Sequence, residues 1–291
     1  MVTAMGGATV SVRESVLLTS ALIQWVADQA GIRILHVKGP AAENVLDFPR
    51  TWSDVDVWVD PARMSDFMAH LEKVGFIAGP KTPNSGWSHS VDMMPGPLWG
   101  ARADVHRRFP GVTIGDQVAF ERLWADRGTL SLGGYPCTTP DRVAHALLIG
   151  LHAARSPQGS AKWVEASSAW ESLSFEERSR LTSLAGDLRA ESALGVRWDE
   201  FSSHSSDRDR EYWTAVAARD ANAVWWYRFL QARHDPRELA EILRSFGYYA
   251  AQLVRLRGGD PVRVAKDLAA RTTAAITSVR RTRARSRHDS R

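Results

Sequence analysis

Cysteine is almost absent from this chain, since Cys137 is the only one among its 291 residues. A single thiol cannot form a disulfide within the chain and cannot supply a cysteine cluster for a metal ion. Long apolar runs are missing too: nowhere do about 18 apolar residues stand together, and residues 1–10 have no basic stretch ahead of an apolar one. We therefore expect a cytoplasmic protein without an export signal or a membrane span.

The net positive charge of the chain comes from the end of the sequence. Residues 280–291 hold six arginines and one aspartate, so the net charge of +4 falls to −1 when they are set aside. A protein that binds nucleic acid ordinarily carries a basic patch on its folded part as well. We expect residues 280–291 to form a disordered, arginine-rich tail, and we do not expect nucleic acid to be a partner.

The pattern of apolar residues predicts an α+β fold in two parts. At 44% hydrophobic content, 291 residues can bury two cores. A small mixed β-sheet of four or five strands with flanking helices is expected over residues 11–138, and a mainly helical domain over 139–279. The second domain is rich in tryptophan and tyrosine, which favours a helical core and leaves open a groove for an acceptor molecule.

What the sequence does have is a pair of acids inside an apolar strand. Asp54 and Asp56 alternate with Val55, Val57 and Val59. Successive side chains of a strand point to opposite faces, so both carboxylates emerge on one face. Like charges held this close repel each other unless a cation lies between them, and Mg²⁺ prefers hard oxygen ligands of this kind. Asp54 and Asp56 are therefore predicted to be two of the ligands of a metal site.

A third acid and a glycine turn complete the pattern. Asp104 and His106 lie on one face of a later strand-like segment, residues 102–109, which makes Asp104 the candidate third ligand. Upstream, a short strand over residues 32–37 runs into Lys38-Gly39-Pro40, and a helical stretch follows. The start of a helix favours an anion, and glycine lets a phosphate approach the backbone.

These residues resemble the nucleotidyltransferase superfamily, and within it an uncharacterised bacterial branch. The resemblance covers residues 15–165 and rests on five elements in order: Lys38-Gly39, Arg50, Asp54-Val55-Asp56, a helix over residues 61–74, and Asp104-Val105-His106. The chain departs from the broader superfamily at Pro40, where serine or glycine usually follows the first glycine. Proline has no N–H, so one backbone donor to phosphate is lost.

The resemblance implies a transferase that uses Mg²⁺ or Mn²⁺. It would move a nucleoside monophosphate from a nucleoside triphosphate to a hydroxyl of a small-molecule, peptide or protein acceptor. Asp54, Asp56 and Asp104 would be the catalytic and metal-binding residues. The nucleotide would bind at positions shared with the pattern, which are Lys38, Gly39, Arg50, Ser53 and His106.

Other interpretations stay open on the sequence alone. The same metal site could take a sugar nucleotide, as in a glycosyltransferase-like tailoring enzyme of peptide natural products, or the fold could serve as a non-catalytic antitoxin or scaffold. Lys38 and Arg50 could be surface cations, and His106 a surface histidine at a strand end. The parity of His89 favours a packed histidine, and a helix-borne pair, His145 and His152, is typical of a structural role.

Overall fold

The computed structural model describes residues 10–79, 89–96, 100–204 and 206–232, and between 239 and 282 the short pieces 239–240, 247, 251, 254–255, 260, 262–263, 266, 269–270, 273–274 and 276–282. By compactness the chain divides into two units. The first combines Met1–Pro80, His89–Ala153 and Ala161–Glu191, and the second combines Lys81–Ser88, Ala154–Ser160 and Ser192–Arg291. The domain limits 11–138 and 139–279 stay a prediction, and residues 283–291 of the tail lie outside the described residues.

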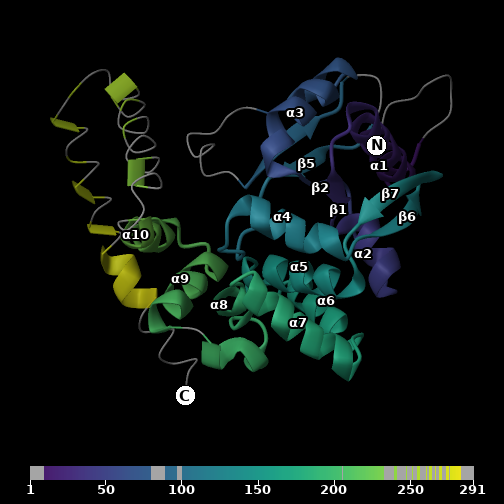
Figure 1. Ribbon diagram of the computed structural model, residues 1–291. Helices are drawn as coiled ribbons and strands as arrows, with labels where there is room; N and C mark the ends of the chain where they lie inside the picture. The colour runs from purple at the N-terminus through teal and green to yellow at the C-terminus, as the bar shows by residue number, and fades with distance from the viewer. Residues whose placement is uncertain are drawn as a thin grey trace. The chain divides into compact units, whose positions relative to one another are not determined.

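A five-stranded mixed sheet forms the centre of the first unit (Figure 1). Its order is β1 (Ile34–His36), β2 (Val55–Val59), β5 (Ala103–His106), β4 (Ser90–Met94) and β3 (Ile77–Ala78). β2 and β5 run parallel, whereas the other neighbouring pairs run antiparallel. Every residue of β2 is buried, as expected for a central strand that is covered on both faces. The predicted α+β fold with a small mixed sheet is confirmed.

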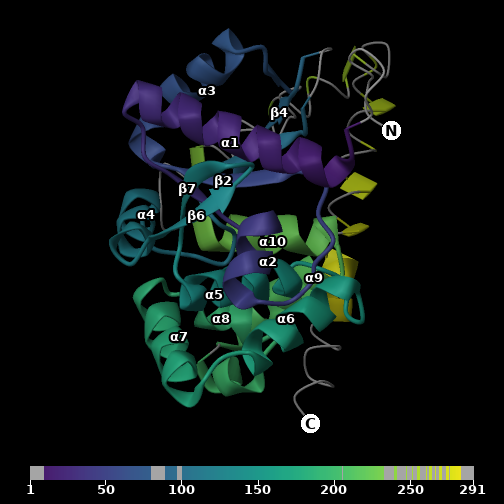
Figure 2. The same ribbon diagram turned by 90° about the vertical axis from the view of Figure 1, so that its right-hand side faces the viewer.

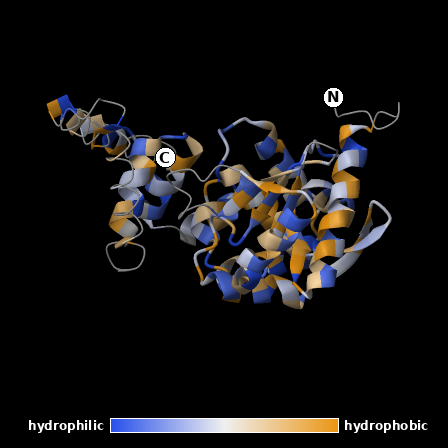
Figure 3. Cartoon of the chain, turned by 90° about the horizontal axis from the view of Figure 1, so that it is seen from above, coloured by the Kyte–Doolittle hydropathy of each residue, from blue (hydrophilic) through white to orange (hydrophobic). Residues whose placement is uncertain are grey.

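Two helices cover one face of this sheet. α1 (Val12–Ala30) and α3 (Met64–Lys73) pack their apolar side chains, among them Ile23 and Phe67, against Val57 and Val105 of the central strands. Figure 2 shows α1 lying along the sheet, and Figure 3 shows hydrophobic residues gathered on the inner strands and helices of this unit. The valines that alternate with Asp54 and Asp56 thus face the core, which leaves the carboxylates on the opposite face.

A capping box fixes where α1 begins. The Ser11 hydroxyl accepts a hydrogen bond from the Glu14 N–H at 3.2 Å, and the Glu14 carboxylate accepts one from the Ser11 N–H at 2.8 Å. We expect Ser11→Ala to lower the free energy of unfolding by about 1 kcal/mol, because the Glu14 N–H loses the hydroxyl that accepts its hydrogen bond. Urea denaturation measures this. Ser65→Ala, at an exposed position of α3, is the control, and an equal loss in both variants would contradict the role of the cap.

The remaining elements of the first unit surround the sheet. A hairpin of β6 (Gly128–Leu132) and β7 (Tyr135–Thr139) packs on α1, and a Cβ atom at Gly133 would come within 2.5 Å of the Leu17 carbonyl oxygen. The other elements are α2 (Gly39–Leu46), η1 (Pro61–Arg63), α4 (Asp116–Ala125), α5 (Arg142–Ala154), α6 (Ala161–Glu171) and α7 (Phe175–Asp187). The Asp60 side chain caps η1 ahead of Pro61 and accepts from the Ala62 N–H at 3.2 Å.

Helices make up the described part of the second unit. The elements after residue 190 are α8 (Glu191–Leu194), η2 (Asp199–His204), α9 (Asp207–Ala217) and α10 (Ala221–Ala232). Ala215, Ala223, Tyr227 and Val279 form a small core. Trp213 and Tyr227 are buried, whereas 40% of Trp225 is exposed. Within the described residues, no helix has both the length and the apolar character that a membrane span requires.

Candidate active site

Three strands bring acidic side chains into one row. Asp56 of β2 lies opposite Asp104 of β5, and Asp104 lies opposite Asp92 of β4. Because opposite residues of neighbouring strands share a face of the sheet, these three aspartates, here called the acidic row, point to the same side. Asp54 precedes β2 by one residue and has the same parity as Asp56. The sequence pattern anticipated Asp54, Asp56 and Asp104, but not Asp92.

Asp56 is the most deeply buried of these acids, with 9% of the residue exposed. Its Oδ1 atom accepts a hydrogen bond from the Lys38 ammonium and lies 3.0 Å from Nε2 of His106. Burial alone would raise the pKa of Asp56, but the positive charge of Lys38 and the interaction with His106 outweigh it and hold the pKa well below its usual range. Asp56 is therefore ionised, and the Lys38 ammonium neutralises its charge.

Asp104 shares the same histidine. Its Oδ2 atom lies 3.2 Å from Nε2 of His106, whose side chain is fully buried. Burial raises the pKa of Asp104, but hydrogen bonds with His106 and Ser90 lower it, and the net result is a pKa of about 2. Asp104 is more accessible than Asp56, with 21% of its side chain exposed. It is thus ionised at neutral pH and open to a ligand.

Arg102 neutralises the acids nearest to solvent. Its Nη2 atom lies 2.8 Å from Oδ2 of Asp54, and its Nη1 atom lies 3.7 Å from Oδ1 of Asp92. The hydrogen bond with Asp54 raises the pKa of the guanidinium above its ordinary value. About a quarter of the Asp54 side chain, 27%, is exposed, so this pair is far more open to solvent than the pair of Lys38 and Asp56.

The turn before α2 has an unusual backbone. Lys38 (φ 56°) and Gly39 (φ 43°) both have positive φ angles, and for lysine such a conformation is strained by about 1–3 kcal/mol. A Cβ atom at Gly39 would lie 3.7 Å from the Asp54 carbonyl oxygen, an ordinary contact. Glycine is therefore needed at position 39 for its φ angle rather than for space. The strained turn directs the Lys38 ammonium onto Asp56.

Arg50 and Ser53 stand apart from the acidic row. The Arg50 side chain, 4% exposed, forms an ion pair with Glu165 of α6, with 2.6 Å between Nη2 and Oε2. Glu165 also binds Lys162 at 3.1 Å. Ser53 is exposed. No ion pair or hydrogen bond joins Arg50 or Ser53 to the acids within the described part of the chain, and the role of both in nucleotide binding stays a prediction.

His89 lies beside the site, one residue before β4. Its ring centroid is 5.4 Å from that of His106, and it is half-buried. In the sequence its parity indicated packing among apolar residues. Only the pairing of β4 with β5 would have revealed it. Ser90 lies opposite His106, so His89, the residue before Ser90, lies at the same end of this strand pair. Glu165, too, was missed, because its partner lies 115 residues away.

The donor set suits a hard cation. Asp56 and Asp104 both approach one nitrogen atom of His106, so their oxygens meet in one place, and Asp54 shares their side of the sheet. Carboxylate oxygens are the ligands that Mg²⁺ prefers. The three predicted ligands therefore fit Mg²⁺ by their chemistry, although Asp54 and Asp56 already pair with Arg102 and Lys38.

Among known proteins, this chain is similar to solved structures. No protein-family model matches the chain, and no curated protein matches it. The solution structure of the antibiotic-resistance factor ANT(2'')-Ia is similar at 16% identity and a TM-score of 0.42, covering 65% of this chain and 95% of that one. A crystal structure from Paracoccidioides brasiliensis is similar at 16% identity and a TM-score of 0.39, covering 65% of this chain and 96% of that one. The second protein is an antigenic nucleotidyltransferase-like protein. At this level of identity and TM-score, neither similarity bears on the substrate of this chain.

Proposed function

We propose that the chain is a metal-dependent nucleotidyltransferase. The observation that carries this proposal is the register of β2 and β5, which sets Asp56 directly opposite Asp104 beside the strained Lys38-Gly39 turn. Two carboxylates on adjacent strands, with Asp54 on the same side, give the three acids that the sequence pattern predicts. The resemblance of the sequence to nucleotidyltransferases gives the class of reaction.

Each residue would have a distinct task. Asp54, Asp56 and Asp104 would hold Mg²⁺, whose chemistry when bound is to polarise a phosphoryl oxygen and neutralise developing charge. The acceptor hydroxyl would form a bond to the α-phosphorus as the bond to the pyrophosphate breaks, and its proton would pass to a carboxylate oxygen of Asp104. Asp104 is the best placed for this, because it is ionised and 21% of its side chain is exposed.

Lys38 and His106 would keep the acids in place and ionised. Both are almost completely buried against Asp56, so neither side chain is free to leave the site without uncovering a buried charge. The phosphate groups of the nucleotide would then lie beside the Mg²⁺ held by the exposed acids, near the start of α2. Arg50 would join it only after leaving Glu165, and Ser53 would contact it from its exposed position.

A sugar-nucleotide donor is the second candidate. Pro40 lies in the first turn of α2 and offers no N–H, so the turn provides one donor fewer for a triphosphate than a Gly-Ser turn does. A diphosphate carrying a sugar needs fewer such donors. Peptide or small-molecule acceptors fit either candidate, and a scaffold or antitoxin would need no donor at all.

Titration calorimetry tests the proposal. The purified chain is titrated with nonhydrolysable nucleoside triphosphates and, separately, with sugar nucleotides, each with and without Mg²⁺. We expect Mg²⁺-dependent binding that Asp54→Ala weakens about tenfold or more, because a carboxylate that faces the nucleotide-bound cation is lost. Arg63→Ala, which removes a partner of Asp66 on the surface of α3, is the control.

The outcomes separate the candidates. Binding of a triphosphate supports nucleotidyl transfer, and binding of a sugar nucleotide alone favours the second candidate. If neither donor binds, or if Asp54→Ala binds as tightly as the wild type, the assignment of these acids to a nucleotide site is wrong.

A further inference from the structure

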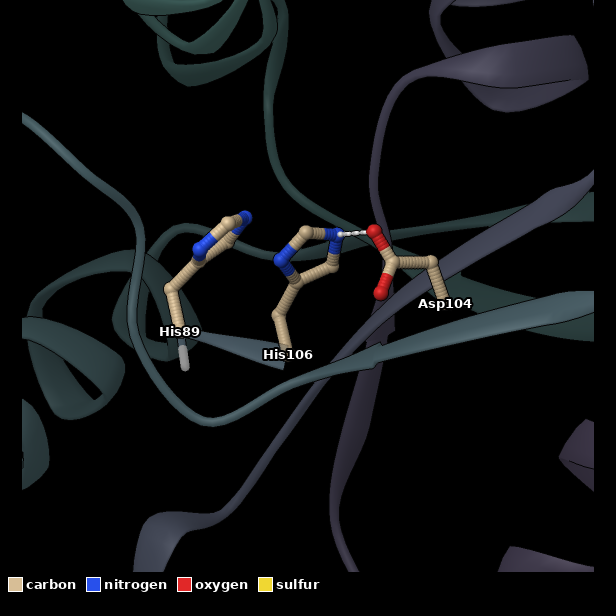
Figure 4. A group of neighbouring side chains, drawn as sticks. All are labelled: His89, Asp104 and His106. Carbon is tan, nitrogen blue, oxygen red and sulfur yellow. Dashed lines mark ion pairs between the residues drawn. The ribbon is translucent and has the colours of Figure 1, made fainter. Parts of the chain in front are cut away.

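A second group of metal-ligating side chains shares Asp104 with the acidic row. His89, Asp104 and His106 each offer one ligand atom, and these atoms all lie within 4.8 Å of one another. Figure 4 shows the imidazole rings of His89 and His106 side by side, with Asp104 on the far side of His106. Two of the three residues are half-buried and the third, His106, is fully buried, so the group is partly shielded from water.

His106 is already oriented as a metal ligand. Its Nε2 atom lies 3.0 Å from Oδ1 of Asp56 and 3.2 Å from Oδ2 of Asp104, so two ionised carboxylates compete for the proton on Nε2. In the neutral form of His106 that donates its Nε2–H to a carboxylate, Nδ1 keeps its lone pair for a metal ion. A histidine that binds a metal ion through one nitrogen usually donates its other N–H to a carboxylate in this manner.

The Nδ1 atom of His106 has no partner of its own. It is completely buried and forms no hydrogen bond. In Figure 4 the nitrogen joined to Asp104 by the dashed line is Nε2, and Nδ1 lies on the other side of the ring, toward His89. A buried acceptor without a partner is unfavourable, and a cation between the two rings would satisfy it.

We propose that His89, Asp104 and His106 form a binding site for one borderline divalent transition metal ion, of which Zn²⁺ is the representative. Imidazole nitrogens are ligands that Zn²⁺ prefers, and zinc sites can keep positions open for water or substrate. Mg²⁺, in contrast, prefers oxygen ligands throughout. Asp104 is the group that orients His106 in this site, because its Oδ2 atom lies 3.2 Å from Nε2 while Nδ1 lies toward His89.

This proposal goes beyond nucleotidyl transfer and does not rest on it. The transition metal site uses His89, which the proposed catalytic set of three aspartates does not include. Its occupation is a property of the protein without nucleotide. Mg²⁺-dependent nucleotide binding and transition metal binding can therefore succeed or fail separately.

Cobalt provides the test, because Co²⁺ replaces Zn²⁺ and its visible absorption reports nitrogen ligands. The full chain, stripped of metal with a chelator, is titrated with Co²⁺ without nucleotide. We expect one equivalent of Co²⁺ to produce visible bands that Zn²⁺ removes and that excess Mg²⁺ leaves unchanged. His89→Ala should weaken Co²⁺ binding about tenfold or more, since one of the ligands is lost.

Two further variants complete the experiment. His89→Gln keeps most of the bulk of the side chain and should lose Co²⁺ in the same way, with far-UV circular dichroism used to confirm that each variant is folded. His70→Ala removes a histidine of α3 outside the group and should bind Co²⁺ as the wild type does. Absence of the bands in the wild type, their removal by Mg²⁺, or wild-type affinity in folded His89 variants would each overturn the site.

Discussion

Replacing Asp56 with alanine is expected to lower the free energy of unfolding by about 3–5 kcal/mol, because it leaves a buried ammonium ion without its counter-charge. The side chain of Lys38 is only 7% exposed, and its ammonium donates to Oδ1 of Asp56. His106 would lose one of its two carboxylate partners as well. Chemical denaturation followed by far-UV circular dichroism measures the loss.

A double-mutant cycle isolates the ion pair. Lys38→Met combined with Asp56→Ala removes both charges, and we expect this double variant to be more stable than Asp56→Ala alone. Asp54→Ala is the matched control, because its partner Arg102 is 47% exposed and such pairs contribute about 1 kcal/mol or less. Equal losses in Asp54→Ala and Asp56→Ala would show that burial of Lys38 does not govern stability here.

Mild acid is expected to destabilise the protein through two buried histidines. Burial lowers the pKa of His36 to about 3, and burial together with the nearby charge of Arg50 lowers the pKa of His145 to about 3. In the unfolded chain a histidine has a pKa of about 6.5, so between pH 6.5 and 3 the unfolded state binds more protons. Stability therefore falls as pH falls through this window, by about 1.4 kcal/mol per pH unit for each histidine.

Asp56 and Asp104 do not contribute to this loss of stability at pH values above their unfolded pKa. Their pKa values are lowered in the folded state, so their stabilisation is complete above their unfolded pKa, about 3.9, and is lost only below it. From pH 7 to pH 5 the two histidines should together remove about 4 kcal/mol. Urea denaturation at a series of pH values gives the slope.

Substitution of the two histidines tests whether they cause this change of unfolding free energy with pH. The double variant His36→Asn, His145→Gln should have a flatter dependence of unfolding free energy on pH between 7 and 5, whatever its stability at pH 7. His70→Gln, on α3, should keep the wild-type slope. An unchanged slope in the double variant would rule out the two buried histidines as the cause.

Local signals in the sequence predicted much of the fold. The helix expected over residues 61–74 is present as η1 and α3, which together run from Pro61 to Lys73. The alternation around Asp56 likewise predicted a buried strand. These patterns depend on contacts close in the sequence, and for this reason they can be read without knowing the tertiary structure.

Contacts between distant residues were not readable in the same way. Parity predicted the common face of Asp54, Asp56 and Asp104, but not that His106 would lie between two of them, nor that Lys38 would be buried against Asp56 rather than open to phosphate. Arg50 resembled a phosphate ligand, yet its partner Glu165 lies far along the chain on α6. Asp92 joins the acidic row only through the register of β4 with β5.

The parallel pairing of β2 with β5 also sets the order in which the site can form during synthesis. Asp56 and Asp104, which lie opposite each other, are separated by 48 positions along the chain (56 to 104). At a translation rate of about 5–20 residues per second, the ribosome needs roughly 2–10 s to add that segment. Throughout this interval Lys38 has been synthesised and His106 has not. Lys38 is therefore the first of the two partners that the Asp56 carboxylate can meet in a growing chain.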